Sequence, residues 1–244
     1  MRRQWADYLY IMPALAVMML VIAYPVYYTV YLSFFSTPPS LAMEDKIYVG
    51  IENYTRILQS ESFHEVTVNT LIWTLYSTFF AFVLGLGAAL VLDREFIGRG
   101  LMRGILLVPY VISAVAASYV WRWMYHSDFG VIGAAAVQLG LATESINFLD
   151  DIDRALPSLI VVNIWKEFPF AMLMMLAGLQ TVPEQLHRAA QVDGANAVQR
   201  FWHVTLPHLK GVTLVTVLLL LVANLNSFTT VSYTHLTLPT KRIV

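Results

Sequence analysis

The sequence of 244 residues contains no cysteine and few charged residues. Without cysteine, the chain forms no disulfide and holds no cysteine-ligated zinc or iron–sulfur cluster. Charged residues make up 13% of the chain, about half the usual share of a soluble domain. Lysine and arginine number 15 against 16 acidic residues, so the basic surplus of a nucleic-acid-binding protein is missing. These absences exclude nucleic acid as the main partner and argue against an ordinary globular domain.

Two common kinds of catalytic site are also missing from the sequence. No Gly-x-x-x-x-Gly-Lys-Ser/Thr segment occurs, so any ATP hydrolysis must come from a separate subunit. The six histidines show neither a His-Glu-x-x-His pattern nor another close ligand spacing. We therefore predict no catalytic residue, no metal site and no cofactor, and we expect the chain not to be an enzyme.

Hydrophobic residues, in contrast, make up 58% of the chain and come in long blocks, with a mean hydropathy of +0.62. A helix needs about 20 apolar residues to cross a membrane. Five segments reach or approach that length: 8–35, 66–92, 105–124, 155–179 and 212–230. The first run continues well past its signal-like Ala14-Leu15-Ala16 site, so we expect it to be retained. The predicted fold is an all-α polytopic membrane helix bundle of five spans over residues 8–230.

The distribution of lysine and arginine predicts the orientation, because short cytoplasmic loops carry the excess. With residues 1–7 in the cytoplasm, the inner segments hold eight cations: Arg2, Arg3, Arg94, Arg99, Arg103, Arg188, Arg200 and Lys210. The outer segments then hold three: Lys46, Arg56 and Arg154. The opposite orientation would reverse this bias, so we place the N-terminus inside.

The loops carry weaker signals. The Pro38-Pro39 pair predicts the end of the first helix, and residues 50–54 predict a turn into a short helix. Residues 130–141 are apolar but too short to cross, so we expect them on the outer surface or folded back partway. Gly85 with Ala89, and Gly100 with Gly104, have the small-xxx-small spacing that lets helices approach closely.

The inner loop over residues 181–210 is the most informative segment. Thr181 and Glu184 have capping-box spacing, Pro183 suits a first turn, and Gly194 is a natural helix stop. This predicts a short helix over about residues 183–193. Asn196 is suited to cap a second short helix through about residue 204, and Pro207 predicts a break before the last span.

One face of the first of these helices is small enough for another protein to approach closely. Leu186, Ala189, Ala190 and Asp193 share this face at spacings of three and four residues. The pattern alone indicates a docking platform rather than a catalytic site.

This loop resembles the cytoplasmic signature loop of the permease subunits of binding-protein-dependent ABC importers. The family pattern is Glu-Ala-Ala, then Asp-Gly-Ala, then Leu-Pro, and the matching residues here are Arg188-Ala189-Ala190, Asp193-Gly194-Ala195 and Leu206-Pro207. Arg188 departs from the pattern and inverts the charge of its glutamate. The resemblance implies that the loop docks in a cleft of an ATPase subunit, through Glu184, Arg188, Ala189, Ala190, Asp193, Gly194, Ala195, Leu206 and Pro207.

The resemblance extends to the carbohydrate-uptake branch of the family, in segments 10–34, 49–54, 69–71, 107–110 and 165–170. Within this branch, the chain is similar to the first permease of the heterodimer in maltose, lactose or glycerol-phosphate importers. This implies six spans in an intact member and a bacterial plasma (inner) membrane location. It also implies three kinds of partner: a second permease subunit, ATP-binding cassette ATPase subunits and an extracytoplasmic solute-binding protein.

Polar residues within the fourth span suggest a substrate path. Asn163, Lys166 and Glu167 interrupt an apolar run, and polar groups inside a membrane are often functional. Neighbouring residues lie about 100° apart on a helix, so we expect only one of Lys166 and Glu167 to face a cavity. The alternative is a purely structural role, as an interhelical ion pair or a side chain reaching an interface.

The resemblance to maltose-type permeases adds sugar-contacting positions. They correspond here to Tyr110, Trp165, Glu167, Phe170, Asn224 and Ser227. Glu167 stands where that pattern has glycine, so we hypothesise that it favours substrates with hydrogen-bond donors. Aromatic rings and polar groups of this kind suit a sugar or polyol.

The last residues, 231–244, differ from the rest. The apolar character stops, and Val231-Ser232-Tyr233-Thr234-His235-Leu236 matches one reading frame of a sequencing-library adapter. We expect this tail to be non-native and the permease to be truncated at its C-terminus; the alternative is a genuine five-span variant.

Two other classes of function remain as alternatives. A secondary transporter of a small polar solute would usually show an internal inverted repeat. A polytopic membrane enzyme would place clusters of His, Asp or Glu at an interface. We find neither pattern in the sequence.

Overall fold

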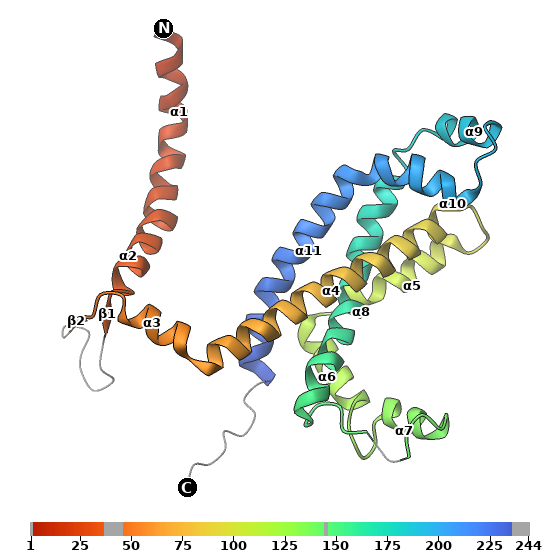
Figure 1. The fold of residues 1–244 in the computed structure, drawn as a ribbon. Coiled ribbons are helices and arrows are strands. Elements are labelled where there is room, and N and C mark those ends of the chain that lie inside the picture. Colours follow the sequence, from red (N-terminus) through yellow and green to blue (C-terminus); the bar gives the residue numbers. More distant parts are fainter. Residues whose placement is uncertain (1, 37–45, 144–145, 236–244) are drawn as a thin grey trace. The chain divides into compact units, whose positions relative to one another are not determined.

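The computed structural model describes residues 2–36, 46–143 and 146–235 (Figure 1). The chain divides into two compact units, residues 1–67 and residues 68–244, and each is described separately. Helices dominate both, and strand pairing in the described residues is limited to one pair of two-residue strands. The predicted all-α class is confirmed.

The first unit begins with one continuous run of helix. α1 (Arg2–Met18), the π-helical segment η1 (Met19–Ala23) and α2 (Tyr24–Leu32) follow one another without a break. Residues Tyr10–Leu32 of this run are long and apolar enough to cross a membrane, as predicted. The run ends before the Pro38-Pro39 pair, which lies outside the described residues.

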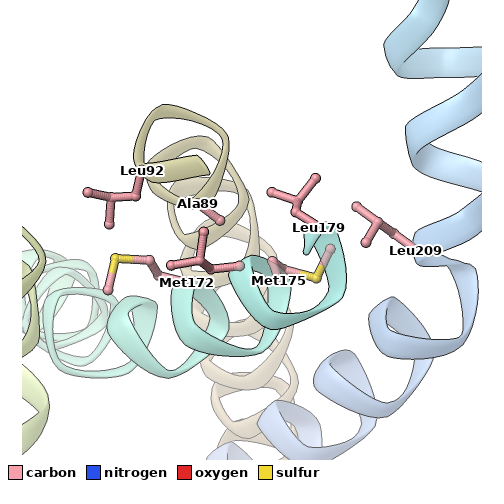
Figure 2. Close-up of a cluster of buried hydrophobic side chains, with 7 residues drawn as sticks. Ala89, Leu92, Met172, Met175, Leu179 and Leu209 are labelled. Carbon is pink, nitrogen blue, oxygen red and sulfur yellow. The ribbon is translucent and has the colours of Figure 1, made fainter. Parts of the chain in front are cut away.

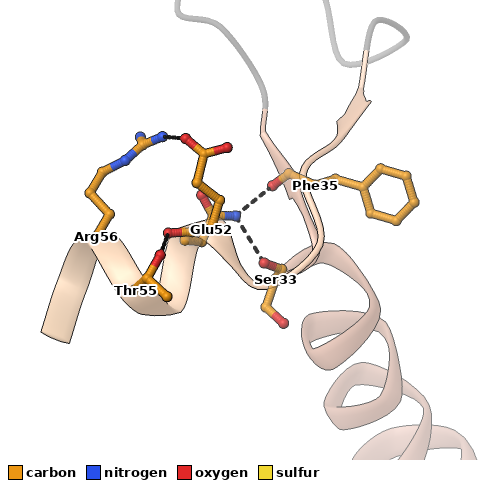
Figure 3. Close-up of polar contacts among 6 residues, drawn as sticks. Ser33, Phe35, Glu52, Thr55 and Arg56 are labelled. Atoms are coloured by element: carbon orange, nitrogen blue, oxygen red, sulfur yellow. Dashed lines mark hydrogen bonds and ion pairs between the residues drawn. The ribbon is translucent and has the colours of Figure 1, made fainter.

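A small hairpin and helix complete the first unit. β1 (Phe35–Ser36) pairs antiparallel with β2 (Ile47–Tyr48), and α3 (Glu52–Gln59) follows the predicted turn. The Asn53 side chain ties helix to hairpin: its Nδ2 donates to the carbonyl oxygens of Ser33 and Phe35, at 2.9 and 3.0 Å (Figure 3).

The second unit contains the rest of α4 (Glu61–Asp93) and the helices that follow it. These are α5 (Arg99–Val111), α6 (Ala114–Met124), α7 (Val131–Gln138), α8 (Ile152–Leu179), α9 (Glu184–Val192), α10 (Ala197–Arg200), the π-helical segment η2 (Phe201–Thr205) and α11 (Leu206–His235). Four helical runs of the described chain could cross a membrane, or five spans if a bent pair counts as one.

That bent pair is the predicted third span, and the expectation of a single helix there is wrong. α5 and α6 meet at 95°, because Ile112 takes an extended conformation with ψ 134°. Ser113 then caps α6, and its Oγ accepts a hydrogen bond from the Ala116 N–H at 3.2 Å. A serine cap within an apolar run thus divides the segment into two shorter helices.

The core of the second unit lies where α4, α8 and α11 meet (Figure 2). Met172 and Met175 of α8 are completely buried, as are Ala89 of α4 and Leu209 of α11. Gly85 allows the close approach that its spacing predicts. A Cβ at this position would lie 2.5 Å from the Ala171 Cβ. Gly100 and Gly104 differ, because a Cβ on either would meet no atom within 4 Å.

Candidate functional site

The elbow, residues 181–210, lies at the end of the second unit where α8 ends and α11 begins, opposite α7 (Figure 1). α9 ends where Gly194 was predicted to stop it. Gly194 has φ +80°, its N–H donates to the Gln191 carbonyl, and the Ala195 N–H donates to the Ala190 carbonyl. This pair of bonds is a Schellman motif, in which glycine supplies the left-handed conformation. The turn between the two helices is therefore fixed by local contacts.

The N-terminal caps of the elbow only partly match the prediction. Asn196 caps α10 through a full capping box with Gln199, with bonds of 2.8 and 2.9 Å. The capping box expected at Thr181 is wrong: Pro183 occupies the cap position of α9, and the Thr181 hydroxyl donates to the Gly178 carbonyl at 2.7 Å. This hydrogen bond holds the Thr181 side chain at the end of α8, so the side chain does not cap α9.

The break predicted at Pro207 is also wrong. α10, η2 and α11 continue into one another, and Pro207 lies in the first turn of α11. Pro207, which has no N–H to donate, directly follows the π-helical segment, where the Leu206 N–H donates to the Phe201 carbonyl five residues back. The wider π-helical turn over residues 201–205 leads the chain into α11 without a break.

Several residues predicted to couple to an ATPase line one hollow of the elbow. The hollow, of about 330 Å³, lies between α9 and the start of the α10–η2 run. Its walls include four of the predicted residues, Ala190, Asp193, Gly194 and Ala195. α9 contains no buried residue, and Ala189 is exposed. The small face is thus open to contact.

The remaining predicted coupling residues do not line this hollow. Arg188 forms an ion pair with Glu184 within α9, with Nη2 2.8 Å from Oε1. Both side chains are more than 70% exposed. Leu206 and Pro207 form the start of α11. The charge at Arg188 therefore has a partner one turn away on its own helix.

A second candidate site is a cavity of about 590 Å³ in the second unit. It is lined mainly by α6 and α8, with Trp73 of α4 and Ser227 of α11. Lys166 and Glu167 both line it, which contradicts the expectation that only one could. The α8 residues on its wall are Leu159, Val162, Asn163, Lys166 and Glu167. They form a stripe about 140° wide, so two neighbours fit on one wall.

The other four residues predicted on the sugar path do not line this cavity. Tyr110 stacks on Phe170 with ring centroids 6.1 Å apart. Trp165 packs edge to face against Trp121, at 5.4 Å. Of the six predicted residues, Glu167 and Ser227 line the cavity.

Asn224 is buried, with 1% of its surface exposed, and joins three helices. Its Oδ1 accepts from Asn163 Nδ2 at 2.6 Å, and its Nδ2 donates to Thr78 Oγ1 at 3.0 Å. We call Thr78, Asn163 and Asn224 the amide seam. Its contacts satisfy polar groups that would be costly to bury alone.

Arg122 is a cavity residue that the sequence reasoning did not select. It lies near the end of α6 and lines the same cavity as Lys166 and Glu167. Its signal in the sequence is a cation within the predicted span 105–124, because charged residues in membrane spans are often functional. No group of three or more His, Asp or Glu residues in the described chain is arranged to hold a metal ion.

Comparison with known proteins shows the family to which the chain is similar. Residues 81–242 match the family described as "Binding-protein-dependent transport system inner membrane component". The chain is 38% identical to the probable ABC transporter permease protein y4oQ of Sinorhizobium fredii, over 81% of the chain and 63% of the relative. It is 36% identical to the sulfoquinovosyl glycerol transport system permease protein SmoG of Agrobacterium fabrum, over 88% and 69%.

A further relative is the trehalose/maltose transport system permease protein MalF of Thermococcus litoralis, 34% identical over 87% of the chain and 70% of the relative. The chain thus spans less than two thirds of the y4oQ relative and slightly more of the other two. A solved bacterial ABC transporter that imports the acidic polysaccharide alginate aligns over 95% of this chain and 76% of its own. Its TM-score is 0.70 and its identity is 25%.

Proposed function

The chain belongs to the family of binding-protein-dependent transport system inner membrane components, and we propose that it is the permease subunit of an ATP-driven sugar importer. It is a multi-pass membrane protein. The names of the relatives support a sugar or polyol as substrate, since two of them carry sulfoquinovosyl glycerol or trehalose and maltose. A solved neighbour in complex with an alginate-bound periplasmic protein supports delivery by a binding protein.

The elbow carries the proposal that an ATPase subunit docks here. It is a compact pair of helices with locally closed caps, a hollow lined by Ala190, Asp193, Gly194 and Ala195, and no buried residue in α9. Because such a unit is rigid and exposed, movement of a docked partner displaces it as a whole without unfolding it. Closure of the ATPase pair moves this elbow and shifts the pore between its inward and outward states. A second permease subunit completes the pore.

Replacement of an exposed alanine tests the docking. Ala189→Trp adds bulk to the small face of α9, so we expect at least about a tenfold loss of co-purified ATPase, since one buried clash of this size costs more than about 1.4 kcal/mol. ATP-dependent sugar uptake falls with it. The measurement is the amount of ATPase subunit retained by the tagged chain in mild detergent, from cells that express all the subunits.

Ala135→Trp is the matched control. Ala135 is also an exposed helical alanine, on α7 at the opposite end of the second unit (Figure 1). This variant should retain the ATPase at the wild-type level. Equal retention in both variants excludes the elbow as the docking site, and uptake that is indifferent to ATP depletion excludes the importer.

A further inference from the structure

The cavity beside α8 contains two cations and one carboxylate. Arg122 of α6 and Lys166 and Glu167 of α8 all line it. The ion pairs found within 4 Å among the described residues involve other side chains. The charged lining is therefore net positive, and neither cation forms an ion pair within 4 Å with a carboxylate of the described residues.

The position of Lys166 makes its charge costly. Lys166 lies 14 residues after the start of α8 and 13 before its end, so it is near the middle of a helix that is long enough to cross a membrane. Ionisable groups at this depth are rare and commonly mark the path of a substrate. A role in stability alone is better served by an apolar residue.

Lys166 does have one structural contact. Its Nζ donates to the Ile112 carbonyl at 3.4 Å, at the break between α5 and α6. That bond is long, and an ammonium has three donors, so two remain for a ligand.

Resting on the importer function proposed above, we propose that this cavity admits a sugar that carries a carboxylate or sulfonate group. Lys166 and Arg122 bind the anion, and charge-assisted bonds of this kind are the stronger ones. Glu167 accepts hydrogen bonds from sugar hydroxyls and repels the anion, so the anion is placed toward the two cations. Ser118, Asn163 and Ser227 line the same space and offer further polar contacts to hydroxyls.

Two probes test the charge preference directly. 4-Nitrophenyl β-D-glucuronide and 4-nitrophenyl β-D-glucoside differ only in a carboxylate or a hydroxymethyl group at one carbon. Equilibrium dialysis against the purified complex with its partner subunits measures the affinity of each. We expect the glucuronide to bind about tenfold more tightly, since a hydrogen bond to a charged group contributes roughly that factor or more.

Three variants should change the ratio of glucuronide affinity to glucoside affinity, two of them downward and one upward. Lys166→Gln and Arg122→Gln each lower the preference to about threefold or less, because a cation is lost. Glu167→Gln raises it, because the repelling charge is removed while an acceptor is kept. A purely structural role for these residues does not predict tighter binding in any variant. Arg94→Gln is the control, since it removes an exposed cation between α4 and α5 that does not line the cavity, and it should leave the ratio unchanged.

The outcomes separate this proposal from the importer function. Equal binding of the two probes by the wild type, or an unchanged ratio in the Lys166 and Arg122 variants, overturns the anionic substrate. So does binding of neither probe. The importer function is judged separately, by the ATPase retained in the same preparation. Lys166→Arg keeps the charge and should keep the ratio; if Lys166→Gln aggregates on gel filtration, Arg122→Gln and Glu167→Gln decide.

Discussion

The elbow and the helix core of the second unit are stabilised in opposite ways. In the core, α4, α8 and α11 pack side chains from distant parts of the sequence, and Met172 and Met175 are completely buried. In the elbow, the hydrogen bonds that fix the turn between α9 and α10 join residues no more than five positions apart, such as the Asn196–Gln199 capping box. Substitutions in the core should therefore change the stability of the chain, whereas substitutions in the elbow should change its affinity for a partner.

The largest effect on stability is expected at the crossing of α4 and α8. Gly85→Ala places a Cβ 2.5 Å from the Ala171 Cβ and 2.7 Å from the Met172 backbone nitrogen, so the helices must separate. Overpacking of this kind costs about 1–3 kcal/mol. We expect a clear drop in the thermal unfolding midpoint, measured by tryptophan fluorescence of the purified chain in detergent.

Gly87→Ala is the matched control on the same helix. A Cβ at Gly87 meets no atom within 4 Å, and alanine is the better helix former by about 1 kcal/mol. This variant should be as stable as the wild type or slightly more so. If the two variants lose stability equally, close packing at Gly85 does not hold the core together.

A smaller effect is expected in the amide seam. Asn224→Leu removes the bonds to Asn163 and Thr78 and leaves the Asn163 amide without its present acceptor. Measured polar bonds between membrane helices contribute about 0.6 kcal/mol on average and at most about 1.7. The same fluorescence assay should show a loss in this range.

Ser227→Ala, one turn further along α11, serves as the control for the seam. Among the described residues, the bond found for the Ser227 hydroxyl lies within its own helix, to the Asn224 carbonyl at 3.1 Å, so its removal should shift the midpoint much less. A larger loss from Ser227→Ala than from Asn224→Leu would contradict the role given to the seam.

The contrast between core and elbow also explains what the sequence could predict. Long apolar runs locate the membrane helices, because their length alone decides whether they can cross. The Gly194 stop and the Asn196 cap were predictable because both depend on neighbours a few residues away. The close approach at Gly85 followed from small-residue spacing. The same spacing at Gly100 and Gly104 meets no packing partner in this chain.

The features that could not be predicted depend on contacts between distant segments. The break at Ile112 is accompanied by a bond from Lys166, 54 residues later. Thr181 is a local exception: its hydroxyl donates to the Gly178 carbonyl, three residues back, and does not cap the next helix. Arg122 of α6 lines the same cavity as Lys166 and Glu167 of α8. The spacing of residues within one helix does not indicate which residues of another helix line the same cavity.

The smallest expected effect on stability is at Arg188, and two similar ion pairs allow it to be separated from docking. Arg188–Glu184 in the elbow and Arg56–Glu52 in α3 (Figure 3) are both exposed pairs four residues apart, at 2.8 and 2.9 Å. Arg188→Ala and Arg56→Ala should each cost no more than about 0.5 kcal/mol, so their unfolding midpoints should be nearly equal.

ATPase retention should then distinguish the two variants, because only Arg188 lies on the proposed docking helix. We expect Arg188→Ala to lower retention by up to about fivefold, the size of an ion pair at the rim of an interface, and Arg56→Ala to leave it unchanged. The Arg188 effect should shrink at high salt, since exposed charges are screened. Equal retention would mean that Arg188 only stabilises its own helix. The docking energy would then come from the small face of α9.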